Sequence, residues 1–501
     1  MDSSHFDVVV CGSDLAGLIV AALLGRRGLR VLVCGQERTP ATFTAGPHTL
    51  AREPGLLPPL DSEPVARIFR ELNYTQILRR RAPPLQPAFQ LLLPRQRIDF
   101  GPPETLATDL EREFPGQASS ITAALDRLCA TSATLEPLLG SDLTLPPDGF
   151  WERREVARVE TQLPPASTDL LAPLSADHPL RAGLSALAAL TSGFAPIDLN
   201  GVIEARLYDL ARRGTFRLDG ALPALRALFL DRIAASSGEV RERLTPVEVV
   251  QRRGRAVGLR VRPRDETIGC EHLVWTSPMS ALLPLCGDKA GRRLRDQAAA
   301  VRAACYRYTL CMLVHPEALP VGMGPRVIAV RDPSQPLLED NAIAITVGVE
   351  DRQKLVPVWA ECLVPAVAAA AGAGYLSVVR ARLRERLGQL LPFHERHLVV
   401  LASPHDGLPP ELADADPLQP PDPIPATPMA AAVTSDLPRT LAIAGAPHAT
   451  GIKNLTLANA ENLPGLGREG EMVSAWGAAR LIAGPQPRRE AGRREILIED
   501  V

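Results

Sequence analysis

The chain has 501 residues and a mass of 53.8 kDa, about three times a typical domain of roughly 150 residues, so two domains or one large composite fold are expected. Hydrophobic residues make up 46% and charged residues 22%, which supplies material for a sizeable core and excludes global disorder. The 55 basic residues nearly cancel the 57 acidic ones, leaving a formal charge of -2. No overall basic field therefore exists to hold nucleic acid.

The chain start and the cysteines favour a reducing, cytoplasmic setting. The first seven residues contain no basic segment, and no stretch of 18 apolar residues occurs, so we predict neither a signal peptide nor a transmembrane helix. The eight cysteines are scattered without the CxxC pairs of a zinc site. Most lie in apolar, strand-like segments and are predicted to be buried free thiols.

The first forty residues predict a βαβ unit. Residues 7–11 form an apolar strand, Gly12 to Gly17 a tight turn, residues 18–27 a helix, and residues 30–34 a second strand. A glycine turn between a strand and a helix is the context in which a dinucleotide fingerprint binds pyrophosphate. The candidate binding residues in this turn are Gly12, Ser13, Asp14 and Gly17.

A second motif lies near the other end of the chain. Residues 453–458 predict a short strand that leads into Asn459-Ala460-Glu461-Asn462. The sequence Pro464-Gly465-Leu466-Gly467-Arg468-Glu469-Gly470 follows and opens a helix. Its candidate binding residues are Asn459, Ala460, Gly465, Gly467 and Gly470.

Together these ends resemble the flavin-dependent amine oxidase and phytoene desaturase superfamily. In that family the N-terminal βαβ unit holds the adenosine diphosphate half of FAD, and the C-terminal strand, loop and helix hold the ribityl chain and flavin ring. Residues 214–275 resemble the family's middle stretch and add Val247 to the expected FAD contacts. The resemblance implies an α/β fold: a Rossmann-like FAD-binding domain of the glutathione-reductase type with an inserted α+β substrate domain.

The expected organisation divides the chain into six segments. They are a βαβ segment of the FAD-binding type at 1–75, a partly helical cap region at 76–195, a second FAD-binding-type segment at 196–290, a substrate domain with an antiparallel sheet and a proline-rich connector at 291–430, a C-terminal FAD-binding-type segment at 431–484, and a tail at 485–501.

The N-terminal motif departs from the family at positions that would contact FAD. Asp14 replaces the glycine that lets the backbone approach the pyrophosphate. A carboxylate about 5 Å from a phosphate costs about 3 kcal/mol at an effective dielectric of about 20. Asp14 is also a good N-cap, so our hypothesis is that it occupies the anion site itself. Gly35 stands where the family has the acid that binds the adenosine ribose, and Glu37 is the nearest substitute.

Three further departures follow. The family's Gly-Gly-Arg is absent between residues 36 and 43. The Gly-Asp pair that contacts the ribityl chain is Asn459-Ala460, so the carboxylate is missing, and Glu461 or Asn462 could replace it only through a loop shift. Glu471 replaces a small residue beside the flavin's pyrimidine edge. The retained glycines also have a purely structural interpretation, because they permit tight turns and close packing whether or not a ligand is bound.

Other candidate residues favour structural roles. Tyr306, Tyr308, Met312 and Trp359 could line a substrate cavity, but core packing is the more frequent role for such residues. His394 and His397 lack a third ligand nearby, so we predict a solvated helix face and no metal site. The run of arginines at 79–81 and the helical stretches between residues 118 and 190 are the candidates for peripheral membrane contact. No catalytic acid or base is identified.

Two hypotheses remain. In the first, the protein is a pseudo-oxidoreductase that has weakened or lost FAD binding and binds an apolar, isoprenoid-like or lipid-like molecule or a protein partner. In the second, it is an active FAD-dependent desaturase or oxidase of an apolar substrate. Asp14, Gly35 and Ala460 favour the first hypothesis, and the glycine loop at 465–470 favours the second.

Overall fold

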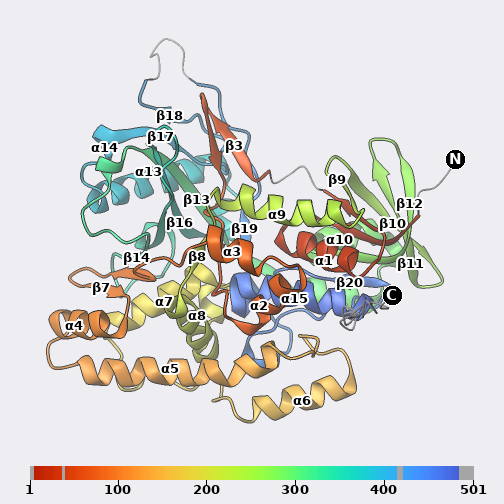
Figure 1. Ribbon diagram of the computed structural model, residues 1–501, viewed down its shortest axis with the longest axis horizontal. Coiled ribbons are helices and arrows are strands. Elements are labelled where there is room, and N and C mark those ends of the chain that lie inside the picture. Colours follow the sequence, from red (N-terminus) through yellow and green to blue (C-terminus); the bar gives the residue numbers. More distant parts are fainter. Residues whose placement is uncertain (1–4, 36–39, 415–420, 485–501) are drawn as a thin grey trace, which may run out of the picture.

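A computed structural model describes residues 5–35, 40–414 and 421–484. Most of the described chain belongs to two sheets with helices packed on them, and Figure 1 shows one sheet on each side of the view. Glu37 and the tail at 485–501 lie outside the described residues.

The first sheet has a parallel core. Strands β20, β12, β1, β2 and β9 pair in parallel, and β10 and β11 extend the sheet from β12 by antiparallel pairing. Each parallel core strand from β12 to β2 is rich in Val, Leu and Cys and lies between layers of side chains, as expected of strands covered on both faces. The strands are β1 (His5–Cys11), β2 (Val31–Cys34), β9 (Glu239–Arg241), β10 (Thr245–Arg252), β11 (Arg255–Arg262), β12 (Glu266–Trp275) and β20 (Leu455–Leu457).

Helix α1 lies at the centre of one face of this sheet. Every residue from Leu15 to Gly25 is buried, which is the pattern of a helix surrounded by protein. It packs between α9 and α15. Two other helices, α10 and α11, contribute side chains to a separate hydrophobic cluster of the same domain. These helices are α1 (Leu15–Arg26), α2 (Glu63–Glu71), α9 (Ala221–Ala235), α10 (Met279–Cys286), α11 (Arg292–Ala300) and α15 (Gly467–Ile482).

The second sheet is mainly antiparallel, with β14 and β6 pairing in parallel. Alternate residues of β13 face opposite sides: Tyr308, Leu310 and Met312 share a core with α13, and Arg307 and Thr309 lie on the other face. The strands are β6 (Phe89–Leu92), β7 (Arg97–Phe100), β13 (Val301–Val314), β14 (Arg326–Val330), β15 (Ala342–Val347), β16 (Val356–Pro365), β17 (Leu398–Ala402), β18 (Glu411–Leu412) and β19 (Ala430–Ser435).

Smaller elements connect the sheets. Two short ribbons pair β3 with β4 and β5 with β8. A helical layer lies along the lower edge of Figure 1. The ribbons are β3 (Thr42–Ala45), β4 (His48–Ala51), β5 (Leu56–Leu57) and β8 (Phe216–Arg217), and the remaining helices are α3 (Thr75–Arg81), α4 (Pro103–Glu113), α5 (Ala118–Leu139), α6 (Phe150–Glu160), α7 (Pro179–Thr191), α8 (Gly201–Arg213), α12 (Ala366–Ala369), α13 (Ala373–Leu390) and α14 (His394–His397).

The predictions about cysteines and membrane helices can be compared with these elements. All eight cysteines are free, and seven of them are buried, as the sequence predicted. Among the described residues, no helix combines the length and the apolar character that crossing a bilayer requires. The same part of the chain contains no cluster of three or more His, Cys, Asp or Glu side chains suited to a metal ion.

Candidate functional site

The turn between β1 and α1 has two of the glycines of a dinucleotide fingerprint, and Asp14 stands between them. Gly12 has φ +118°, a conformation that favours glycine. A Cβ on Gly17 would lie 2.3 Å from the Gly12 carbonyl oxygen, so close backbone packing alone requires that glycine. Asp14 is the N-cap of α1, and its Oδ1 accepts a hydrogen bond of 2.8 Å from the Gly17 N–H. The predicted N-cap is therefore confirmed, and the carboxylate takes a donor that a phosphate would use.

The surroundings of Asp14 weaken its acidity. The side chain keeps accessible surface, yet the protein around it displaces water and raises its pKa to about 7. The Gly17 N–H and Arg226 oppose this shift, while Glu471 adds to it. A group whose charged form is desolvated and repelled by a second carboxylate is a poor neighbour for a pyrophosphate dianion.

Arg226 of α9 also contacts the turn between β1 and α1. Its Nη1 donates to the Ser13 carbonyl, its Nη2 lies 3.2 Å from Ser13 Oγ, and it forms an ion pair with Glu242. The guanidinium is thus committed to the protein's own oxygens. It links Ser13 to the end of β9, across the place where the resemblance put the cofactor.

Gly35, at the end of β2, has no room for the acid that the family carries there. A Cβ at this position would lie 2.4 Å from the Glu242 Cα, and the Gly35 N–H donates to the Arg241 carbonyl. Strand β9 therefore occupies the space where a side chain at 35 would begin. Glu242 lies beside this position, but its carboxylate is paired with Arg226.

The C-terminal turn after β20 is held by its own side chains. Asn459 is buried and its amide donates to the Ser277 carbonyl, while Glu461 accepts a 2.9 Å hydrogen bond from the Met279 N–H at the start of α10. Asn462 Oδ1 accepts from the Asn459 N–H and from the Ser474 hydroxyl. Ala460 is exposed and carries no polar atom on its side chain. Glu461 and Asn462 are thus already engaged and do not replace the missing carboxylate.

The glycines of the loop at 464–470 meet protein backbone. A Cβ on Gly467, whose φ is +53°, would lie 2.2 Å from the Thr191 carbonyl oxygen. One on Gly470 would lie 2.1 Å from the Leu463 carbonyl oxygen, and one on Gly465 would lie 2.9 Å from the Ile443 Cα. Close packing within the protein is sufficient to explain all three glycines.

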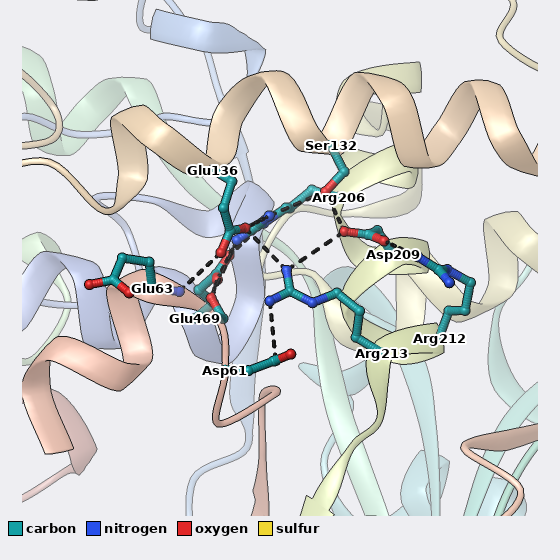
Figure 2. Close-up of polar contacts among 10 residues, drawn as sticks. Asp61, Glu63, Ser132, Glu136, Arg206, Asp209, Arg212, Arg213 and Glu469 are labelled. Atoms are coloured by element: carbon teal, nitrogen blue, oxygen red, sulfur yellow. Dashed lines mark hydrogen bonds and ion pairs between the residues drawn. The ribbon is translucent and has the colours of Figure 1, made fainter. Parts of the chain in front are cut away.

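Glu469 anchors this loop to the interior (Figure 2). Its carboxylate accepts two hydrogen bonds from Arg206 of α8, at 2.6 and 2.9 Å, and one from Ser62 at the start of α2. Arg206 also contacts Glu136 of α5, and both Arg206 and Glu469 are buried. The network ties α2, α5 and α8 to the loop and to the first turn of α15.

A chain of ion pairs lies at the start of α15. Arg468 contacts Glu53 at 2.8 Å and Glu471 at 3.1 Å. Burial acts to raise the pKa of both carboxyls. For Glu53, the charges of Arg468 and Arg52 outweigh burial, so its net pKa is lowered. For Glu471 burial prevails and its pKa is raised. One arginine thus bridges a stronger and a weaker acid where the resemblance placed the flavin's pyrimidine edge.

The sheet face next to these ion pairs carries both charged and apolar side chains. Arg326 of β14 lies 3.5 Å from Glu361 of β16 and donates to the Thr346 hydroxyl at 2.6 Å. Glu361 is paired in register with Thr309 of β13, and Arg307 donates to the Leu190 and Ser192 carbonyls. The same face also carries Ile328, Ala344 and Leu363, which belong to an apolar cluster, so it is neither uniformly polar nor the uniformly aliphatic surface expected of an isoprenoid site.

The remaining sequence-predicted residues have identifiable places. Val247 lies at a register irregularity between β10 and β11. Tyr308 and Met312 are in the core beneath α13, and the Trp359 indole donates to the Ala51 carbonyl. His394 is buried with its Nδ1 2.8 Å from the Leu391 carbonyl, so the prediction that this histidine lies on a solvated face is wrong. His394 turns inward because it packs against α13, where a Cβ on Gly388 would lie 3.6 Å from its Cε1.

Sequence reasoning missed the partners of the fingerprint residues. It did not assign Arg226, Arg468, Glu53 or Arg206 a role, because each acts through a residue far away in the chain. Arg468 and Glu469 stand between the loop glycines, so the sequence shows two charged side chains in this loop. It does not show which residues they contact.

Comparison with known proteins supports the fold. The sequence matches no protein-family model, and no curated protein matches it. By structure, it is similar to an oxidoreductase from Methanosarcina mazei, with a TM-score of 0.61, 13% identity, and coverage of 95% of this chain and 99% of that one. A triple mutant of putrescine oxidase gives a TM-score of 0.61 at 14% identity, covering 96% of this chain and 99% of that one.

Cyclohexylamine oxidase from Brevibacterium oxydans is also similar, with a TM-score of 0.51, 13% identity, and coverage of 95% and 98%. The chain therefore has the α/β fold of flavin amine-oxidase-type proteins, as the resemblance in sequence predicted. At such identities the likeness establishes the fold alone, so function has to be argued from the residues of the site.

Proposed function

We propose that this protein is a pseudo-oxidoreductase: it keeps the fold of flavin-dependent oxidoreductases and has lost FAD binding in the family's manner. The observation that carries the proposal is the pairing of Asp14 with the Gly17 N–H while Arg226 binds Ser13 and Glu242. These side chains take up the donors and space of the pyrophosphate site. FAD supplies hydride-accepting chemistry where it is bound, but these residues do not fit it.

The energetics favour this proposal. A carboxylate about 5 Å from a phosphate costs about 3 kcal/mol, whereas the helix N-terminus favours an anion by about 0.3–1 kcal/mol. Displacing Arg226 from Ser13 would also leave Glu242 without its partner. Protonating Asp14 removes the repulsion, but the side chain still hydrogen-bonds the donor at Gly17.

The ligand of such a scaffold is either an apolar molecule or a protein partner. Arg307, Arg326 and Glu361 face the interior side of the second sheet, and burying an isoprenoid chain against them would strip water from charged groups. Arg326 and Glu361 are themselves buried, so a protein partner would have to bind elsewhere on the surface. The alternative function, an active FAD-dependent desaturase or oxidase, is supported by the fold and the glycine loop, whose glycines also have packing roles.

The test is the visible absorption spectrum of the purified protein, repeated after incubation with excess FAD and desalting. We expect no flavin band in either sample. A stoichiometric band that survives desalting would refute the proposal and favour the oxidoreductase alternative.

A variant sharpens the test. Asp14→Gly, combined with Arg226→Gln, should restore measurable FAD binding by fluorescence quenching, because it frees the Gly17 N–H and the Ser13 carbonyl region. Asp265→Gly, at an exposed hairpin position, is the control and should bind no FAD. Failure of the double variant to gain affinity would show that Asp14 and Arg226 are not what blocks the site.

A further inference from the structure

A cleft of about 340 Å³ lies away from the fingerprint turn, between the segment at 83–86 and the ends of β14 and β15. Its lining includes the apolar residues Pro84, Leu319, Met323, Pro325 and Val347, and polar atoms share the surface with them in similar measure. The volume falls at the lower end of the range for small-molecule sites, which combine apolar walls with a few polar groups that fix orientation.

Arg217 of β8 is the charged residue among those that line this cleft. Of its three guanidinium nitrogens, Nη1 donates to the Val347 carbonyl, and Nε is buried without a partner among the described residues. No carboxylate of the described chain lies within ion-pair distance of it. Burial lowers the pKa of Arg217, and Asp219 only partly opposes this shift.

A second arginine, Arg206, has the carboxylate partners that Arg217 lacks. The Arg206 guanidinium is also buried, but Glu469 binds it through two oxygens and Glu136 contacts it as well. A guanidinium presents a planar fork that matches a carboxylate, and a desolvated cation without an anion is costly. Arg217 has the fork, but within the described part of the chain no carboxylate lies within ion-pair distance of it, and Asp219 acts on it only from farther away.

We propose that this cleft binds a small monocarboxylate with an apolar body. The carboxylate accepts hydrogen bonds from Nη2 of Arg217, the guanidinium nitrogen that is neither buried nor bonded to the Val347 carbonyl, and the hydrocarbon part packs against Leu319, Met323 and the prolines. The site is separate from the fingerprint turn, so it neither depends on nor tests the loss of FAD binding.

Hexanoate is the first probe, with hexan-1-ol as its neutral counterpart, and binding is followed by saturation-transfer NMR on the full chain. We expect saturable hexanoate binding at least tenfold tighter than that of the alcohol, because hydrogen bonds to an ionised acceptor are stronger than neutral ones. No saturable hexanoate binding, or equal affinity for the alcohol, would overturn the proposal.

Two variants locate the site. Arg217→Gln should weaken hexanoate binding at least tenfold and leave that of hexan-1-ol unchanged, whereas Met323→Trp should weaken both by filling the cleft. The matched control is Arg264→Gln, an exposed arginine outside the cleft, which should bind hexanoate as the native protein does. If Arg217→Gln does not fold, Met323→Trp and the comparison of hexanoate with hexan-1-ol still test where hexanoate binds. Unchanged hexanoate binding in Met323→Trp would place the acid outside this cleft and refute the assignment.

Discussion

The turn at residues 12–17 keeps two of the three glycines of a cofactor-binding fingerprint and the loop at residues 464–470 keeps all three of its glycines, but the protein holds the two segments in different ways. In the turn, Asp14 faces the anion position and Arg226 reaches across from another helix. In the loop, Glu469 points inward and is bound by Arg206. Glycine spacing therefore reports how closely two backbones approach, whereas the side chains between the glycines decide what the segment holds.

The largest expected effect tests the inward anchor of the loop. Arg206→Met should destabilise the protein by about 3–5 kcal/mol, because it leaves the buried Glu469 carboxylate without its partner. The free energy of unfolding from urea denaturation measures this. Arg292→Gln, whose side chain is 94% exposed, is the control and should change stability by less than about 0.5 kcal/mol.

The double variant Arg206→Met with Glu469→Leu separates charge from packing. Replacing a buried ion pair by apolar side chains of similar volume is often nearly neutral, so the double variant should recover most of the stability that the single one loses. An equal loss in both variants would mean that the loop depends on Arg206 for shape and not for charge compensation.

An intermediate effect is expected at the glycines of the loop. Gly470→Ala places a Cβ 2.1 Å from the Leu463 carbonyl oxygen and should cost about 1–3 kcal/mol, as overpacking does. Gly374→Ala, in the first turn of α13, where a Cβ meets no atom within 4 Å, should be neutral or slightly stabilising. Thermal unfolding with and without FAD measures both, and a melting temperature of the native protein that rises with FAD would assign the glycines to the cofactor instead.

The sequence predicted the fold because its evidence was local. Buried strands, a glycine turn and an all-buried helix follow one another within the first forty residues, and each leaves a pattern in neighbouring positions. The departures at Asp14, Gly35 and Ala460 could be seen for the same reason. The N-cap at Asp14 needs only the Gly17 N–H three residues on, so it was predictable as well.

The partners of those residues could not be predicted from spacing. Arg226 meets Ser13 through the packing of α9 against α1, and Glu53 meets Arg468 across more than four hundred residues. Such contacts depend on how helices are placed by the whole core. The sequence therefore showed which positions depart from the family pattern, while only the structure shows which side chains contact them.

The smallest expected effect concerns the pH dependence of the outward-facing turn. The pKa of Asp14 is raised from 3.8 to about 7 in the folded protein, so between these values the folded state binds a proton that the unfolded state releases. The contribution of Asp14 to the free energy of unfolding therefore falls as pH rises from about 4 to about 7 and stays at its lower value above that range. Asp14→Asn should remove this contribution, so the variant gains stability relative to the native protein across the same window.

Urea unfolding at pH 4.5, 5.5, 6.5 and 7.5 measures that difference, and using the difference cancels the contributions of other acids such as Glu461 and Glu471. Asp265→Asn, at an exposed hairpin position, is the control and should show a constant difference. A constant difference for Asp14→Asn too would mean that Arg226 and the Gly17 N–H keep the carboxylate ionised at acidic pH. The turn would then hold a permanent anion in place of the phosphate, and its exclusion of FAD should persist unchanged below neutral pH.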